Sequence, residues 1–164
     1  MLRHALLCTG VVASVFAICP SASGAAEFGT PEEAQAMLKR AVASVKRDKL
    51  AAIASFNHND LSFRDRDLFV FCFDGGDGRF TAHEAFVARD VRELRDANGA
   101  PFGAEIYYTA QEGEIAKVVY IAPVPGSTDL AVKGAYATRI GDQVCGVSAY
   151  QLGGSGQLLT IVQP

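Results

Sequence analysis

The run Leu68-Phe69-Val70-Phe71-Cys72-Phe73 constrains the fold more than any other part of this 164-residue chain. It contains no charged residue and has polar residues on both sides. Successive side chains of a strand point to opposite faces of a sheet, so an all-apolar strand needs cover on both faces. The run therefore predicts a buried strand in a sheet with further structure packed on each side.

Two helices are predicted before this strand. Thr30-Pro31-Glu32-Glu33 has the pattern of a capping box with proline at the first helical position. The apolar residues that follow recur at helical spacing, which indicates one buried helix face: Ala34, Leu38, Ala41, Val42 and Val45. A second helical stretch runs from Leu50 to Phe56 and ends at a turn.

After the buried strand the pattern alternates between turns, short helices and strands. The turn 74–78 predicts a hairpin whose return strand is 79–83, followed by a short helix at 88–94 and a helix from Pro101 to Gly113. Three further strands are predicted at 115–121, 131–140 and 143–151. This order predicts an α+β fold with a five-stranded antiparallel sheet. The long N-terminal helix would cover one face of the sheet and segment 82–113 the other. We expect a small ligand pocket between the sheet and segment 82–113.

The two ends of the chain are predicted to lie outside this domain. Segment 1–26 has Arg3, an apolar run from Ala5 to Ile18 and small residues before Glu27, which is typical of a secretory signal peptide. An uncleaved membrane anchor is the alternative, although the run is short for a span. The domain is then 27–151, and 152–164 is predicted to be a flexible tail whose apolar stretch 158–162 has no obvious partner.

Charge argues against two classes of partner. The formal net charge is −3, and loss of Arg3 with the signal would make it −4. A mildly acidic domain is a poor ligand for nucleic acid or for an anionic membrane surface. No second apolar segment approaches spanning length, so we expect a secreted or periplasmic protein with no membrane span in its mature chain.

Cys72 and Cys145 are the cysteines that remain after signal removal. In an oxidising compartment two such cysteines can form a disulfide, and they can equally be two buried free thiols that act as small apolar residues. The residues alone leave both alternatives open.

The order and spacing of several short motifs resemble single Cache domains of the second type. The resemblance covers about Thr30 to Gln151. It rests on Asp65-Arg66-Asp67-Leu68-Phe69-Val70-Phe71, Phe73-Asp74, Asp77-Gly78, Ala82-His83, Gly99-Ala100-Pro101-Phe102-Gly103, Lys133, Tyr136, Gly141-Asp142, Val144, Gly146 and Tyr150. The sequence departs from the family pattern after His83, where Glu84-Ala85-Phe86 stands in place of a proline and the segment to Asp96 is short.

The resemblance implies a PAS-like fold and extracytoplasmic sensing of small organic molecules, often short carboxylic acids. In that fold the first and last strands are neighbours, which would bring Cys72 and Cys145 together. Nothing like a membrane helix or signalling module follows Gln151, so we expect a stand-alone exported member. Such a domain would pass its signal to a separate membrane partner, or would only hold its ligand.

The candidate chemistry points to binding rather than catalysis. The sequence has no nucleophile elbow, phosphate loop or metal-ligand spacing, so we predict neither an enzyme nor a cofactor or metal site. Cations can neutralise a ligand carboxylate, and tyrosine or histidine can orient it. The predicted ligand-binding residues are Arg66, His83, Tyr120, Lys133 and Tyr136. An alternative function is a periplasmic protein–protein interaction module with a vestigial pocket.

Overall fold

A computed structural model describes residues 27–154 and 157–161 of the chain. The predicted signal peptide therefore lies outside the described residues. The elements, in chain order, are α1 (Pro31–Arg47), α2 (Lys49–Asn57), β1 (Arg64–Asp65), β2 (Leu68–Asp74), β3 (Phe80–Ala82), the 3-10 helix η1 (Val91–Glu93), α3 (Phe102–Thr109), β4 (Ala116–Pro123), β5 (Leu130–Ile140), β6 (Gln143–Tyr150) and β7 (Thr160–Ile161).

The first helix begins as its sequence predicts. The Glu33 backbone N–H donates to the Thr30 hydroxyl at 3.2 Å, and the Thr30 N–H donates to the Glu33 carboxylate at 2.8 Å. This reciprocal pair satisfies two donors that the first helical turn leaves without partners. Asp48 ends α1 and caps α2 by accepting from the Ala51 N–H, so the two helices follow each other almost directly.

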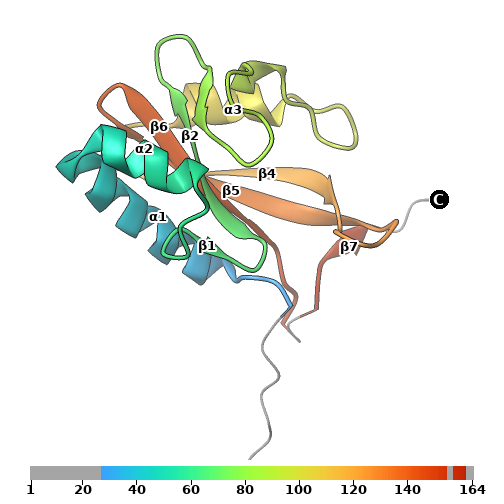
Figure 1. The fold of residues 1–164 in the computed structure, drawn as a ribbon. Helices are drawn as coiled ribbons and strands as arrows, with labels where there is room; N and C mark the ends of the chain where they lie inside the picture. Colours follow the sequence, from blue (N-terminus) through green and yellow to red (C-terminus); the bar gives the residue numbers. More distant parts are fainter. Residues whose placement is uncertain (1–26, 155–156, 162–164) are drawn as a thin grey trace, which may run out of the picture.

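The strands form one antiparallel sheet in the order β1-β2-β6-β5-β4, with β3 added to β2 and β7 to β5. The predicted α+β fold with a long N-terminal helix is confirmed. The first and last long strands, β2 and β6, lie side by side, as the resemblance implied. Figure 1 shows α1 and α2 on one face of the sheet and α3 on the other.

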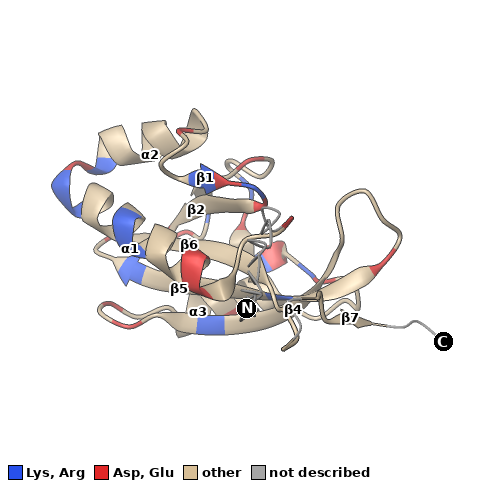
Figure 2. Cartoon of the chain, turned by 90° about the horizontal axis from the view of Figure 1, so that it is seen from below, with Lys and Arg blue, Asp and Glu red and all other residues tan. Residues whose placement is uncertain are grey.

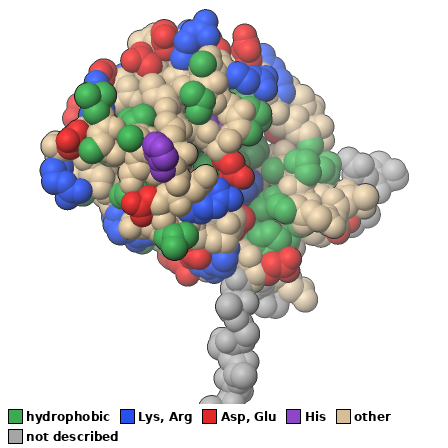
Figure 3. All heavy atoms as spheres, viewed as in Figure 1, with side chains coloured by type: hydrophobic (Ala, Val, Ile, Leu, Met, Phe, Trp, Pro, Cys, Tyr) green, Lys and Arg blue, Asp and Glu red, His purple; other side chains and the backbone are tan. Residues whose placement is uncertain are grey.

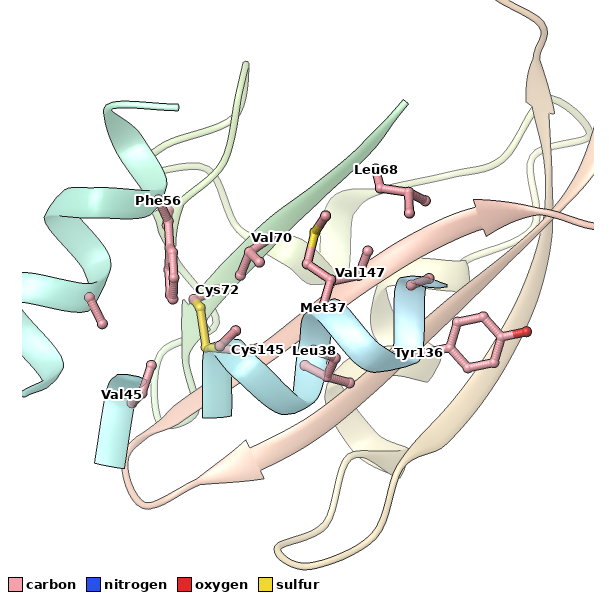
Figure 4. Packing of buried hydrophobic residues seen from close by; sticks show 14 of the residues in the cluster. Met37, Leu38, Val45, Phe56, Leu68, Val70, Cys72, Tyr136, Cys145 and Val147 are labelled. Carbon is pink, nitrogen blue, oxygen red and sulfur yellow. A yellow bond between two sulfur atoms is a disulfide. The ribbon is translucent and has the colours of Figure 1, made fainter. Parts of the chain in front are cut away.

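The face beneath α1 and α2 is a closed, mainly aliphatic core. Figure 4 shows this packing, in which α1 contributes Met37, Leu38 and Val45 and the strands contribute Val70 and Val147. All of these side chains are buried. Even-numbered residues of β2 and odd-numbered residues of β6 supply this face, because side chains alternate along each strand.

A disulfide joins the two central strands within this core. Cys72 and Cys145 are direct partners in the β2–β6 register, and their sulfur atoms are bonded (Figure 4). Both residues are fully buried. Of the two alternatives that the sequence left open, the structure therefore has the disulfide.

Two segments differ from the sequence-based expectation. Only Val91–Glu93 is helical within the predicted helix 88–94, because Ala88 has a positive φ of 67° and Asp90 pairs with Arg79. The tail segment Thr160–Ile161, for which the sequence indicates no obvious partner, pairs with Leu130–Ala131. Strand β5 extends beyond the end of β6 at this point, and its open edge offers backbone groups to a further strand.

Charges of both signs are interspersed on the surface. Figure 2 shows basic and acidic residues next to each other at β1 and its turn, and the face seen in Figure 3 carries both signs rather than a continuous basic stripe. None of the helices within 27–154 and 157–161 is both long and apolar enough to cross a membrane.

Candidate functional site

A cavity of about 230 Å³ lies between the sheet and the cover formed by η1, α3 and the segments beside them. We call it the inner cavity. Its walls are mainly aromatic and aliphatic, with a few polar groups. They comprise Phe69, Phe71, Phe80, His83, Phe86, Val91, Leu94, Phe102, Ile106, Tyr120, Lys133 and Ser148.

Strand alternation determines which residues reach this cavity. Phe69 and Phe71 are odd-numbered residues of β2, on the face opposite the closed core. Lys133 on β5 pairs directly with Tyr120 on β4, so their side chains share one face of the sheet. A side chain at Gly146 on β6 would overlap the Phe71 ring, so glycine there leaves room for that ring.

Ring–ring contacts build the apolar wall. Phe102 from α3 stacks on Tyr120 with ring centroids 4.2 Å apart and planes 9° from parallel. His83 stacks on Phe86 at 4.6 Å and meets Phe80 edge to face at 4.8 Å. These contacts hold the cover against the sheet and give the cavity a surface suited to an apolar ligand body.

Lys133 is the charged group of the inner cavity. Its side chain is only 12% exposed, and its Nζ lies 3.7 Å from Asp67 Oδ2, which is too long for a hydrogen bond. The same ammonium lies 4.3 Å from the centre of the Tyr150 ring. Burial lowers the Lys133 pKa from its usual value, and the Asp67 charge opposes that shift. An anionic ligand group would stabilise the charged form of this lysine.

His83 is a neutral hydrogen-bonding group. Its Nδ1 accepts from the Ala85 backbone N–H at 3.0 Å, which places the proton of the neutral ring on Nε2. Burial lowers the His83 pKa to about 4, with the Glu84 charge acting weakly in the opposite direction. At neutral pH His83 is therefore an uncharged donor through Nε2.

Tyr120 provides a neutral hydroxyl. Burial raises its pKa to about 12, and a hydrogen bond with Ser148 offsets part of that effect. The hydroxyls of Tyr120 and Ser148 thus form a pair of polar groups in an otherwise apolar wall. Together with Lys133 and His83 they could bind one anionic or strongly polar group, such as a carboxylate.

The structure brings together three of the predicted site residues and separates two others. His83, Tyr120 and Lys133 line the inner cavity. Arg66 lies outside it, where its guanidinium donates to Asp65, Glu33 and the Phe28 carbonyl. Tyr136 is buried on the opposite face of the sheet, in the core beneath α1 (Figure 4).

Sequence reasoning missed most of the cavity wall. Phe69 and Phe71 could have been found from the alternation along β2, since every second residue of a doubly buried strand faces the side away from the helix. Ser148 could have been found in the same way, because it alternates with the closed-core residues Val147 and Ala149 on β6. Phe86 and Phe102 carry no such signal, because their positions depend on how the cover folds over the sheet. Within the described residues, no group of three or more His, Cys, Asp or Glu side chains could hold a metal ion.

Solved structures that are similar to this chain include two sensor domains. One is described as the periplasmic sensor domain of a chemotaxis protein; it has a TM-score of 0.51 and 22% sequence identity, over 71% of this chain and 87% of that chain. The other is described as the structural basis for carboxylic acid recognition by a Cache chemosensory domain, with a TM-score of 0.46, 13% identity, and 71% and 85% coverage. No protein-family model and no curated protein sequence matches the chain.

The first of these similarities shows the fold. This chain has the α+β architecture of a periplasmic sensor domain, with a long N-terminal helix on one face of an antiparallel sheet. The assignment of this chain to Cache domains of the second type stays a prediction, and so does its status as a stand-alone protein. The roles of the five candidate binding residues are also predictions.

Proposed function

We propose that this chain is an extracytoplasmic domain that binds a small organic monocarboxylate and does not transform it. The observation that carries the proposal is the position of Lys133. Its ammonium is nearly buried in the wall of an aromatic cavity and has no carboxylate within hydrogen-bond distance among the described residues. Its counter-ion is Asp67 Oδ2, 3.7 Å away and not hydrogen-bonded to it. A buried cation with so loose an ion pair costs free energy, which a bound anion would offset.

The cavity limits the ligand by size and by charge. Cavities of about 150 Å³ hold benzene, so about 230 Å³ suits a molecule of roughly six to ten non-hydrogen atoms. Lys133 is the one cation among the lining residues. A second carboxylate would lie against phenylalanine rings without compensation, so we expect monocarboxylates to bind better than dicarboxylates.

The extracytoplasmic location is supported by two observations. Segment 1–26 has the pattern of a signal peptide, and the Cys72–Cys145 disulfide is of the kind that persists in oxidising compartments. The fold shared with a periplasmic sensor domain agrees with this location. We propose that the bound state is read by a separate membrane partner.

A thermal-shift experiment tests the binding proposal. We expect butyrate and benzoate to raise the melting temperature, because a ligand specific to the folded state stabilises it by about 2.7 kcal/mol at 100 times Kd. The neutral isosteres butyramide and benzamide, and the dicarboxylate succinate, should give much smaller shifts. Equal responses to acids and amides would contradict the role of charge. No response to any probe would overturn the proposal and favour the interaction-module alternative.

Two lysine variants locate the site. Lys133→Met should abolish the response to both carboxylates, whereas Lys117→Met should keep it. Lys117 is a matched control because it lies on the neighbouring strand, is exposed and pairs with Gln151 outside the inner cavity. If Lys133→Met keeps the full carboxylate response, the anion binds elsewhere and the assignment of the site is wrong.

A further inference from the structure

Asp67 has an unusual environment that the proposed ligand site does not explain. Its side chain is 10% exposed. Oδ1 accepts from the Gly29 backbone N–H at 2.7 Å, but the buried Oδ2 has no hydrogen-bond partner among the described residues. The charge nearest to Oδ2 is Lys133 Nζ, 3.7 Å away. A carboxylate oxygen buried in this way is costly, so the position of Asp67 is maintained by its surroundings.

The turn that carries Asp67 is held firmly. Arg66 and Asp67 form the two-residue connection between β1 and β2, and Arg66 has a positive φ of 52°, which is uncommon for a residue other than glycine. The Arg66 guanidinium donates to Glu33 on α1 at 2.6 Å and to the Phe28 carbonyl at 3.0 Å. These bonds attach the turn to the segment that enters α1.

A second cavity lies on this side of Lys133. It has a volume of about 440 Å³ and we call it the outer cavity. Asp67 and Arg66 line it, and it shares Phe69 and Lys133 with the inner cavity. Lys133 therefore stands in the wall between a site for ligand and the turn that contacts the entry of α1.

Lys133 reaches the entry of α1 by two routes. In the first, its Nζ lies beside Asp67, whose other oxygen binds the Gly29 N–H. In the second, Nζ lies over the Tyr150 ring, and that ring meets the Phe28 ring edge to face at 5.1 Å. Phe28 and Gly29 are adjacent, so two independent sets of contacts join one ammonium to one short piece of chain.

Gly29 is closely packed on the inner side. It is buried, and a methyl group there would overlap the Leu68 side chain. Gly29 thus packs directly against Leu68, and hydrogen bonds to Asp67 and Arg66 attach the Phe28–Gly29 segment to the turn between β1 and β2.

We infer that Asp67 is a positioning residue for Lys133, and that it couples filling of the inner cavity to the packing of the Phe28–Gly29 segment. The coupling to a ligand rests on the proposed function, because the same lysine serves both. An anion in the inner cavity competes with Asp67 and the Tyr150 ring for one ammonium. As Lys133 turns toward the anion, Asp67 becomes a buried charge without its counter-ion. This favours turning of the carboxylate into the outer cavity, away from the Gly29 N–H. If a bound anion loosens the Phe28–Gly29 segment, then loosening that segment must in turn raise the affinity of the inner cavity for the anion, because coupling between two sites is reciprocal.

The first test needs no ligand. Amide hydrogen exchange at Gly29 is measured in the full chain and in Lys133→Met. Without the lysine, Asp67 is a buried charge with no counter-ion, so we expect exchange at Gly29 to accelerate by at least about tenfold, the scale of one hydrogen bond. Lys117→Met should leave it unchanged. Unaltered exchange at Gly29 in Lys133→Met would overturn the inference. If Lys133→Met folds poorly, Lys133→Gln is used for the same comparison.

Asp67→Asn separates positioning from simple packing. The neutral amide can still accept from the Gly29 N–H but needs no counter-charge. In this background Lys133→Met should no longer change exchange at Gly29. Lys133→Met could instead accelerate Gly29 exchange equally in the natural chain and in the Asp67→Asn variant. In that case the acceleration does not depend on the Asp67 charge, and the inference is wrong.

The ligand test distinguishes this inference from the proposed function. Saturating butyrate or benzoate should accelerate Gly29 exchange in the natural chain but not in Asp67→Asn, in which the thermal shift by the probes persists. Probes that bind without changing Gly29 exchange would overturn the coupling and leave the proposed function standing. Probes that fail to bind, together with faster exchange in Lys133→Met, would overturn the proposed function and leave Asp67 as a positioning residue.

Discussion

The two faces of the sheet use the same strands in opposite ways. Beneath α1 the side chains are mainly aliphatic, buried and joined by the Cys72–Cys145 disulfide. On the other face, aromatic rings, aliphatic side chains and a few polar groups surround a cavity of about 230 Å³. Close packing maximises stability, whereas a hollow lowers it and creates a place for a ligand. The comparison indicates that the closed face stabilises a fold whose other face is kept open for binding.

Removal of the disulfide should have the largest effect on stability. The double variant Cys72→Ala/Cys145→Ala releases a connection between residues 73 positions apart, so we expect the free energy of unfolding to fall by about 4 kcal/mol. Urea denaturation measures it. The carboxylate response should persist under conditions where the variant is folded, because both sulfurs face away from the inner cavity. A loss below about 1 kcal/mol would contradict the stabilising role of the closed face.

A matched pair of leucine truncations compares the faces directly. Leu38→Ala, in the closed core, should cost about 3 kcal/mol, because the fully buried site leaves a new void. Leu94→Ala, in the wall of the inner cavity, should cost about 1 kcal/mol, because Leu94 is only partly buried and borders space that already exists. Equal costs in denaturant titrations would show that the cavity face is as tightly packed as the other.

Acid should weaken the cavity face through His83. The folded-state pKa of about 4 lies below the usual 6.5, so the unfolded chain binds this proton more readily. The resulting stability is fully present above pH 6.5, falls as the pH drops toward 4, and amounts to about 1–3 kcal/mol. His83→Gln should have a flatter stability curve across this range. Identical pH slopes for the two proteins would show that burial does not depress the histidine pKa.

The smallest effect is expected from a pair of tyrosine variants. Tyr120→Phe removes one hydroxyl from the inner cavity and keeps the ring stacked on Phe102, so the affinity for butyrate or benzoate should fall about fivefold, near 1 kcal/mol. Tyr136→Phe removes a hydroxyl from the other face and should leave the affinity unchanged. Calorimetric titration measures both, and equal losses would show that the tyrosine hydroxyl in the cavity has no special role.

Local patterns predicted the fold well. The capping box at Thr30 and Glu33 acts within one helical turn, and the apolar run from Leu68 to Phe73 requires cover on both faces whatever the rest of the chain does. The tail was harder to predict. Pairing of Thr160–Ile161 with β5 depends on β5 extending past β6, which is a property of the assembled sheet.

The candidate site was predicted only in part. Lys133 and Tyr120 stand opposite each other on paired strands and both line the inner cavity. Tyr136 lies three residues from Lys133 on the same strand, so alternation places it on the other face, and the sequence already contained this information. The position of Arg66 could not be read from the sequence, because its partners Glu33 and Phe28 come from another part of the chain.

Strand alternation has a consequence for how such a domain can change. On β2, Leu68 and Val70 of the closed core are each followed by a residue of the cavity wall, so Phe69 and Phe71 can be exchanged while the core residues stay. Single substitutions on the cavity face can therefore change which ligands bind while the closed core stays intact. A mutant library limited to Phe69, Phe71, Tyr120, Lys133 and Ser148 would explore ligand chemistry on an unchanged scaffold.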